Sequence, residues 1–223
     1  HYDVDNDFFE LFLDKKYRAY SCGVWKKAKN LEQAQEDKFD RLCHYANVAQ
    51  GHRVIDIGCG WGGLMNSITE KYPNTSVHGL TLSREQFEFI NSTPKSNISL
   101  ELRAWQDYLP TEDKFDSIIS IGAFEHFASF EDQAASRQRD IYSTFFDWCR
   151  NISTPDAQIG LQTIVITRAP NTLSELRDSR YLLDKVFPGS ALPSISDIQA
   201  AIIDKYEISA VCRIGFDYAR TLS

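Results

Sequence analysis

Residues 54–63 read Val-Ile-Asp-Ile-Gly-Cys-Gly-Trp-Gly-Gly, a β-branched strand run that passes directly into a glycine-rich turn. The glycines that form this turn are Gly58, Gly60 and Gly62. In open α/β sheets, such a turn at the carboxyl end of a parallel strand binds nucleotide-like cofactors. The G-x-G-x-G spacing is neither the G-x-G-x-x-G of a dinucleotide site nor a P-loop. It suits S-adenosylmethionine (SAM); the alternative is a tight strand-to-helix turn that binds no ligand.

Composition restricts the class of protein and its partners. The 223 residues are 43% hydrophobic and 25% charged, which is ordinary for one soluble globular domain. A formal net charge of −7 argues against nucleic acid as a partner, and allows at most peripheral membrane contact. One basic cluster near the amino terminus is either a solvated surface or a contact for lipid headgroups or an acidic carrier: Lys15, Lys16, Arg18, Lys26, Lys27 and Lys29.

The cysteine pattern indicates free thiols. The five cysteines form no CxxC pair and no metal-ligand spacing, so we expect no metal site: Cys22, Cys43, Cys59, Cys149 and Cys212. Widely spread cysteines in odd number favour a reducing compartment, and no run approaches the length of about 18 apolar residues of a membrane span. These features predict a cytoplasmic protein, while nothing in the sequence indicates the oligomeric state.

Strand and helix patterns alternate after Gly51, which predicts an α/β fold with a doubly wound, mostly parallel sheet. Strands are expected at 52–57, 75–80, 98–103, 115–121, 159–166 and near 207–214. Helices are expected at 3–14, 31–48, 62–72, 83–91, 140–149, 171–186 and near 196–205.

The second strand ends without the acidic residue that usually holds a dinucleotide ribose. Thr81, Ser83 and Gln86 stand there instead and offer hydrogen bonds to a ribose or a carboxylate. Trp105, just after the third strand, either lies against an adenine face or is a core tryptophan.

A carboxylate and a histidine follow the strand 115–121, in the sequence Ser120-Ile-Gly-Ala-Phe-Glu-His-Phe127. Burial among phenylalanines raises the pKa of a carboxyl group toward neutrality, which suits proton transfer at Glu125. The alternative is a helix N-terminal carboxylate with no chemical role.

Several motifs together resemble the cyclopropane-fatty-acid synthase family, which includes the mycolic-acid cyclopropane synthases. They are His1-Tyr-Asp-Val-Asp-Asn-Asp-Phe-Phe9, Tyr20-Ser-Cys22, GCGWGG at 58–63, GLTLSREQ at 79–86, SIGAFEHF at 120–127, FPGSALPS at 187–194 and DYARTL at 217–222. The motifs occur in the family's order and cover nearly the whole chain.

The resemblance implies a Rossmann-like, class I SAM-dependent methyltransferase of the transferase class. It implies an amino-terminal helical lid over residues 1–50 and a SAM-binding domain over residues 51–223, within one folding unit. The reaction implied is addition of a methyl or methylene group to a carbon–carbon double bond of an unsaturated, lipid-like acyl chain, with S-adenosylhomocysteine (SAH) as the second product.

The resemblance also implies the site residues. Those for SAM are Tyr20, Ser21, Asp56, Gly58, Gly60, Gly62, Thr81, Leu82, Gln86, Trp105, Gln106 and Ile121. Those for a bicarbonate-like anion beside the reacting carbon are Cys22, Glu125, Gln162, the backbone of Ile164, and Tyr218. The anion is expected to remove the proton that closes the cyclopropane ring.

Three departures from the family pattern keep other functions open. Gln162 stands where many relatives carry histidine, and a glutamine cannot relay a proton. The region 128–158 differs from the family's usual short helix, because Ser129–Arg139 is polar and lengthened. The family's last antiparallel strand does not follow Ser223, so we expect a truncated sequence. The alternatives are a small-molecule C- or N-methyltransferase of secondary metabolism and a SAM-binding subunit without catalysis.

Overall fold

The computed structural model describes residues 13–109, 111–183 and 190–223, and its chain forms two compact units. The sheet unit holds the described residues up to Ile121 together with Ile152–Gln162 and Ser209–Ser223. The helical unit holds the described residues of Gly122–Asn151 and Thr163–Ile208. The boundary expected at residue 50, between a lid and a cofactor domain, stays a prediction.

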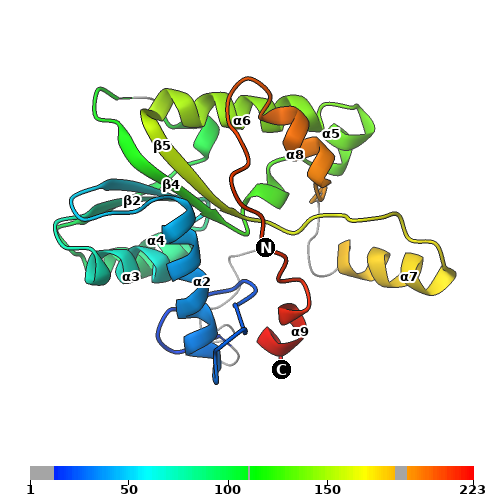
Figure 1. Ribbon diagram of the computed structural model, residues 1–223, viewed down its shortest axis with the longest axis horizontal. Helices are drawn as coiled ribbons and strands as arrows, with labels where there is room; N and C mark the ends of the chain where they lie inside the picture. The colour runs from blue at the N-terminus through cyan, green and yellow to red at the C-terminus, as the bar shows by residue number, and fades with distance from the viewer. Residues whose placement is uncertain (1–12, 110, 184–189) are drawn as a thin grey trace. The chain divides into compact units, whose positions relative to one another are not determined.

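Five parallel strands form one sheet in the order β3-β2-β1-β4-β5 (Figure 1). Their bounds are Arg53–Ile57 (β1), Ser76–Thr81 (β2), Ile98–Leu102 (β3), Phe115–Ile121 (β4) and Ser153–Gln162 (β5). The chain runs from β1 outward to β3 and then returns to the other side of β1 with β4. This reversal confirms the doubly wound parallel sheet.

The central strand β1 is paired on both of its edges and buried along most of its length. Val54 and Ile55 are fully buried, and Ile57 is 2% exposed. Burial of such a side chain stabilises the fold by roughly 1.5–3 kcal/mol. Ile57 lies opposite Leu80 of β2 and Ser120 of β4, so three strands end at the same edge of the sheet.

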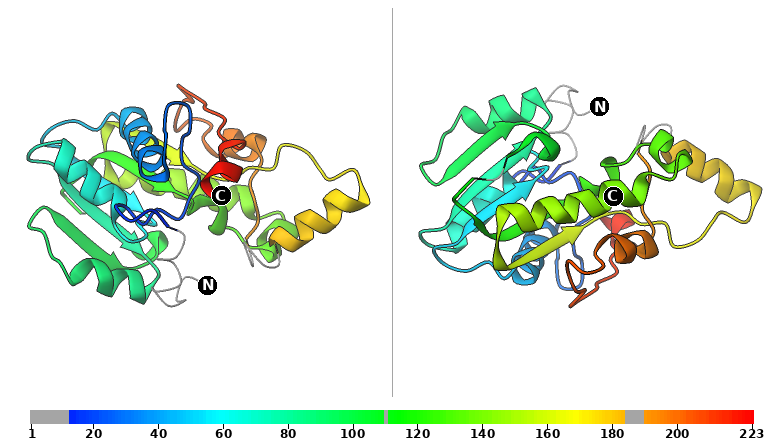
Figure 2. Two further views of the ribbon diagram at one scale, coloured as in Figure 1. Left: turned by 90° about the horizontal axis from the view of Figure 1, so that it is seen from below. Right: turned by 90° about the horizontal axis from the view of Figure 1, so that it is seen from above.

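Three helices pack on the sheet and lie on one of its faces in Figures 1 and 2. They are α2 (Leu31–Tyr45), α3 (Gly63–Lys71) and α4 (Arg84–Asn91). Asn30 begins α2, since its side chain accepts the N–H of Gln33 at 2.9 Å. The helix α2 contacts β5 and α3, whereas α3 contacts β2 and α4 contacts β3.

The last helix of the sheet unit, α9 (Asp217–Thr221), is held by the amino-terminal segment. The Thr221 hydroxyl accepts the N–H of Gly23 at 3.0 Å, and the Asp217 carboxylate accepts the N–H of Trp25 at 3.0 Å. These bonds bring residues near 22 and near 218, both of which carry predicted site residues, into one region of the sheet unit.

The helical unit is organised around aromatic rings. Its elements are η2 (Phe124–His126), α5 (Phe130–Ala134), α6 (Gln138–Ile152), α7 (Leu173–Tyr181) and α8 (Ile195–Ala201). Phe124 is fully buried and stacks on Tyr142 of α6, with ring centroids 4.4 Å apart. Phe127 packs on Phe145 at 4.9 Å. The polar segment after residue 128 forms α5, which begins with a capping box between Ser129 and Asp132.

Two expectations about strands are wrong. The fifth strand runs over 153–162 instead of 159–166, because its pairing with β4 begins at Ser153 and ends at Gln162, opposite the last residue of β4. Thr163, just beyond it, donates its hydroxyl to Glu125. Residues 207–214 alternate like a strand but form no helix or strand, and in the described sheet they pair with no other strand. Alternation alone does not stabilise a strand that lacks a partner for its backbone groups.

The predicted helices agree with the structure in position, with differences in their ends. The helix expected over 171–186 begins two residues later, at Leu173; α7 runs to Tyr181, residues 182–183 continue as π-helix, and residues 184–186 lie outside the described residues. The helix α8 ends at Ala201 rather than near 205. The helix expected over 3–14 lies almost wholly outside the described residues. Among the described residues, none of the helices combines the length and the hydropathy needed to span a bilayer.

The contact between α2 and β5 requires a glycine at position 160. A Cβ atom there would lie 2.6 Å from the backbone oxygen of Leu42. We expect Gly160→Ala to destabilise the fold by about 1–3 kcal/mol because backbone must move to make room. Chemical denaturation measures this change. Gly215→Ala is the control, since a Cβ atom there meets nothing within 4 Å and its stability should stay near that of the parent chain.

Candidate active site

The ends of β1, β2 and β3 bring three predicted cofactor segments to one edge of the sheet. The N–H groups of Gly58 and Cys59 both donate to the Leu80 carbonyl, at 2.9 and 3.0 Å. The N–H of Arg103 donates to the Thr81 carbonyl at 2.9 Å. The glycine turn, the segment after β2 and the segment after β3 are therefore fastened to one another through the backbone.

The turn depends on glycine for two different reasons. Gly58, Gly60 and Gly62 have φ of +78°, +55° and +79°, in the left-handed region that favours glycine. A Cβ atom at Gly62 would press on Ile90 and Met65 at 3.2 Å, whereas one at Gly60 would meet nothing within 4 Å. Gly62 thus allows close packing, and Gly60 borders open space of the kind that a cofactor fills.

Asp56 places a buried carboxyl group directly before this turn. It is 2% exposed, and within the described part of the chain its Oδ2 atom has no hydrogen-bond partner. Burial raises the pKa of Asp56 to about 7, against the lowering effect of the Lys38 ammonium. A buried acceptor without a donor costs free energy, so a ligand ammonium or hydroxyl at this position fits the site.

The residues after β2 form a buried network of hydrogen bonds. The Thr81 hydroxyl donates to Gln86 Oε1 at 2.8 Å and accepts the N–H of Ser83 at 3.1 Å. Ser83 begins α4, and its hydroxyl accepts the N–H of Gln86 at 3.3 Å. Leu82 is the exception, since 76% of its surface is exposed.

The remaining cofactor candidates lie at the ends of β3 and β4. Trp105 is buried in the short helix η1 (Trp105–Asp107), next to the exposed Gln106. Ile121 is the half-buried last residue of β4. Stacking of Trp105 on adenine stays a prediction, because burial of its indole also fits a core residue.

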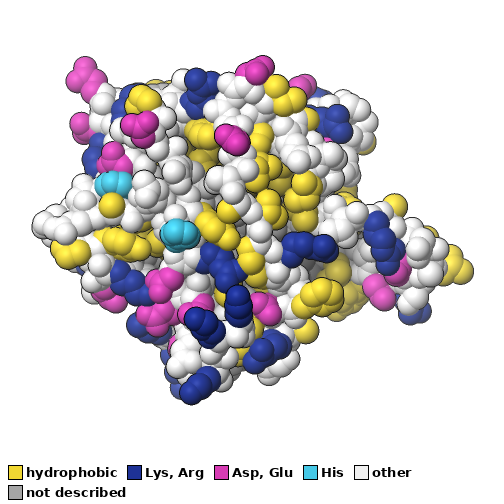
Figure 3. Space-filling view, in the orientation of Figure 1, with side chains coloured by type: hydrophobic (Ala, Val, Ile, Leu, Met, Phe, Trp, Pro, Cys, Tyr) yellow, Lys and Arg dark blue, Asp and Glu magenta, His cyan; other side chains and the backbone are white. Residues whose placement is uncertain are grey.

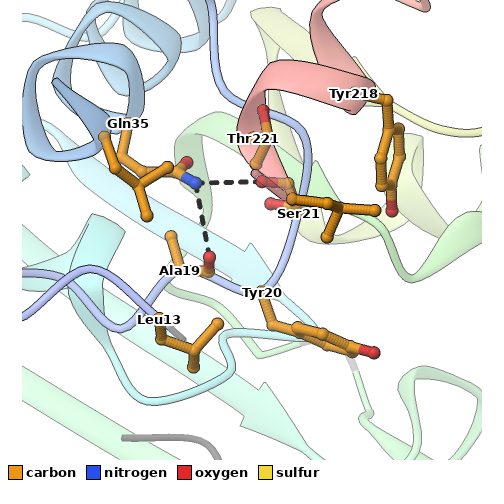
Figure 4. A pocket seen from close by; sticks show the side chains of 9 residues that line it. Leu13, Ala19, Tyr20, Ser21, Gln35, Tyr218 and Thr221 are labelled. Atoms are coloured by element: carbon orange, nitrogen blue, oxygen red, sulfur yellow. Dashed lines mark hydrogen bonds between the residues drawn. The ribbon is translucent and has the colours of Figure 1, made fainter. Parts of the chain in front are cut away.

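A pocket in the sheet unit brings two predicted cofactor residues close to a predicted anion ligand (Figure 4). Tyr20 and Ser21 line it from the amino-terminal segment, Gln35 from α2, and Tyr218 from α9. Gln35 Nε2 donates to the carbonyls of Ser21 and Ala19 at 3.0 and 3.3 Å. The other lining residues are mostly apolar: Leu13, Ala19, Leu31, Thr221 and Leu222.

Cys22 and Gln162, two more predicted anion ligands, contact each other in the sheet unit. Gln162 Nε2 donates to the Cys22 carbonyl at 3.1 Å, and Cys22 Sγ lies 3.5 Å from the Ile214 carbonyl. Burial raises the pKa of Cys22, and the hydrogen bond with Thr221 opposes this only in part. The thiol is therefore a protonated donor at neutral pH and not a nucleophilic thiolate.

Glu125 and Ile164 belong to the helical unit, so the five predicted anion ligands are divided between the two units. Glu125 is 3% exposed and accepts the Thr163 hydroxyl at 2.8 Å. Burial raises the pKa of Glu125, while its own backbone N–H, Thr163 and the backbone of Ile164 stabilise the ionised form. The pKa of Glu125 stays above that of an exposed carboxyl group because burial outweighs these hydrogen bonds.

Four polar contacts near these groups were not predicted. Lys38 and Gln35 of α2 are buried beside Ser21, Thr163 holds Glu125, and His126 Nδ1 lies 2.6 Å from Ser190 Oγ. The sequence carried one signal for the first contact, since Lys38 falls among the apolar positions of the helix. The described residues contain no group of three or more His, Cys, Asp or Glu that is arranged to hold a metal ion.

Comparison with known proteins places the chain in a family. The family model described as mycolic acid cyclopropane synthetase matches residues 1–223. The chain belongs to this family. It is 33% identical to cyclopropane mycolic acid synthase 2 of Mycobacterium leprae over 241 residues, covering 100% of this chain and 76% of the relative.

Two further comparisons agree. The chain is 34% identical to cyclopropane-fatty-acyl-phospholipid synthase of Escherichia coli, and covers 53% of that protein, about half of its length. The crystal structure of mycolic acid cyclopropane synthase CmaA1, a complex with SAH and CTAB, has a TM-score of 0.81 and 28% identity. That comparison covers 99% of this chain and 78% of the other.

Family membership confirms the expected SAM-dependent methyltransferase with a Rossmann-like fold. It also confirms SAM as the cofactor. The residues of the sheet unit fit this cofactor, because Asp56 has a buried acceptor without a donor and Gly60 borders open space. The roles of the individual site residues stay predictions.

A substitution at Gly60 tests whether the turn from Gly58 to Gly62 binds the cofactor. Gly60→Ala adds a methyl group to open space, so we expect SAH affinity to fall at least about tenfold and stability to fall by about 1–2 kcal/mol. Calorimetric titration with SAH and thermal unfolding measure the two effects. Gly51→Ala is the matched control, since Gly51 has φ of +80° and equally open surroundings. If both variants bind SAH as the parent chain does, the turn from Gly58 to Gly62 does not bind the cofactor.

Proposed function

We propose that this chain transfers the methyl group of SAM to a carbon–carbon double bond in an unsaturated acyl chain of a lipid. The names of the mycobacterial and E. coli relatives support this acceptor class. The observation within the chain that carries the proposal is Glu125: a buried carboxyl group in the short helix η2, bonded to Thr163 and flanked by aromatic residues that pack on one another.

Binding of the cofactor is assigned to the sheet unit. Asp56 accepts hydrogen bonds from the methionine end, and the turn from Gly58 to Gly62 admits it without a clash. Tyr20 and Ser21 contact it from the amino-terminal segment. The proposed ribose and adenine contacts are Thr81, Leu82, Gln86, Trp105, Gln106 and Ile121. When bound, SAM supplies an electrophilic methyl group.

An alkene is a weak nucleophile, so the protein must place it in line with that methyl group in a site without water. Methyl transfer to one alkene carbon leaves a positive charge on the other. The half-buried ring of Phe127, two residues after Glu125, offers an aromatic face that stabilises a cation, while the fully buried Phe124 packs against it.

Ring closure requires removal of a proton from the transferred methyl group, whose C–H electron pair then forms the third bond of the ring. We assign this proton to an anion of the bicarbonate type. Its proposed holders are Glu125, Cys22, Gln162, the backbone of Ile164, and Tyr218. The protonated thiol of Cys22 is a suitable donor to such an anion.

We also propose where the protein is located in the cell and how it contacts a membrane. All five cysteines are free, which supports a cytoplasmic location. Figure 3 shows Lys and Arg side chains beside Asp and Glu side chains over the part of the surface where α2 lies. With charges of both signs there, we propose peripheral rather than strong membrane contact.

Lipid extracts from a host that expresses the protein and receives methyl-labelled methionine test the acceptor. We expect labelled unsaturated acyl chains to gain the mass of one methylene group, with loss of one label hydrogen.

Glu125→Gln should lower kcat at least about 100-fold and leave SAH affinity unchanged. Glu131→Gln, an exposed residue of the same unit, is the control. Label found only in small metabolites supports the alternative, a small-molecule methyltransferase.

The pH dependence of turnover tests the state of Glu125. Thr163→Val removes a donor that stabilises the carboxylate, so the pKa of Glu125 should rise further. If the ionised form is needed, the acid limb of the kcat profile moves to higher pH, by roughly one pH unit. Thr163→Ser keeps the hydroxyl and should keep the parent profile. An unchanged limb in Thr163→Val means that a different group titrates.

A further inference from the structure

The helix α2 carries two polar residues on a buried face that is otherwise apolar. Gln35 is fully buried and Lys38 is 1% exposed, among Ala34, Phe39 and Leu42. Lysine is almost never fully buried unless it is paired. A helix that only had to cover the sheet would carry apolar side chains at both positions.

Both side chains reach the same residue of the amino-terminal segment. Lys38 Nζ donates to Ser21 Oγ at 2.6 Å, and Gln35 Nε2 donates to the Ser21 carbonyl at 3.0 Å, the latter drawn in Figure 4. Asp14 holds the preceding part of this segment, because its Oδ2 accepts the N–H of Ala19 at 2.8 Å. The backbone and the hydroxyl of Ser21 are therefore fixed from α2.

Two acceptor atoms in this part of the sheet unit have no hydrogen-bond partner within the described residues: Gln35 Oε1 and Asp56 Oδ2. Both are side-chain oxygens of residues that are at least nine-tenths buried. Buried acceptors are normally satisfied, so two of them, on α2 and just before the glycine turn, indicate that the arrangement is completed by a ligand with donor groups.

Charge connects Lys38 to the glycine turn. Burial lowers the pKa of Lys38 to about 7, and Asp14, Cys22 and Asp56 oppose this. Burial raises the pKa of Asp56 to about 7, which Lys38 opposes. The thiols of Cys43 and Cys59 also interact with Asp56. The protonation of this pair is thus sensitive to any new charge placed beside it.

We propose that Lys38 is a positioning residue for the methionine end of SAM, acting through Ser21 and Asp56. Gln35 assists it by holding the Ser21 backbone. Since Lys38 touches the amino-terminal segment and interacts with the carboxyl group before the glycine turn, cofactor binding and ordering of residues 19–22 occur together. The inference rests on the proposed assignment of Ser21 and Asp56 to the cofactor.

The test is a double-mutant cycle on SAH binding, measured by calorimetry with the full chain. Lys38→Met should weaken SAH binding about tenfold or more, since a hydrogen bond from a charged donor is lost. Ser21→Ala should then cost less in the Lys38→Met background than in the parent chain. Lys27→Met, an exposed lysine, is the control and should bind as the parent does.

Two readouts separate positioning from a merely structural role. In Lys38→Met without ligand, the amides of residues 19–22 should exchange hydrogen faster, while exchange in β1 is unchanged. In the parent chain, SAH binding near pH 7 should take up or release protons, measured in buffers of different ionisation enthalpy. This second measurement needs no substitution and stands even if Lys38→Met fails to fold.

The outcomes differ for the two proposals. If the parent chain binds SAH without proton exchange, or Lys38→Met binds it with unchanged affinity, the role of Lys38 is overturned and the cofactor assignment stands. If Lys38→Met lowers only the melting temperature, Lys38 is structural. If the parent chain does not bind SAH, the proposed cofactor site and this inference both fail.

Discussion

The pairing of β1 on both of its edges is the constraint on which the site depends. Because β2 and β4 both run parallel to β1, their carboxyl ends lie beside the glycine turn. Two hydrogen bonds from Gly58 and Cys59 to Leu80 then fix the turn itself. Glycine adopts the left-handed conformations of this turn without strain, and the two bonds hold the turn against the end of β2.

A second theme is burial of ionisable groups in a region of low dielectric constant. Asp56, Lys38 and Glu125 are each almost completely removed from solvent, and the pKa of each moves toward neutrality. Such placements cost stability unless partners compensate them. The hydroxyl groups of Ser21 and Thr163 bond to Lys38 and Glu125, and both lie beside residues that the family resemblance assigns to the reaction.

Much of the fold can be predicted from local sequence patterns. Where the prediction is wrong, the reason is physical. The first four strands were predicted to within a residue or so because β-branched runs and turn glycines mark their ends. The alternation of apolar and polar residues over 207–214 predicted a strand that does not form, since a strand also needs the edge of another strand to pair with. The fifth strand was displaced because its bounds are set by pairing with β4, from Ser153 to Gln162, and no local pattern reports a partner strand more than 30 residues away.

The sequence by itself determined the class of the sheet, the glycine turn, the family and the cofactor. Each of these depends on short motifs of neighbouring residues, which the sequence shows directly. Only the tertiary structure decided which polar groups are buried and what they contact. Lys38 stands among the apolar positions of its helix in sequence, but only the folded chain brings its ammonium group to the Ser21 hydroxyl. Burial changes the free energy of a charge, and burial is a property of the folded chain and not of any segment within it.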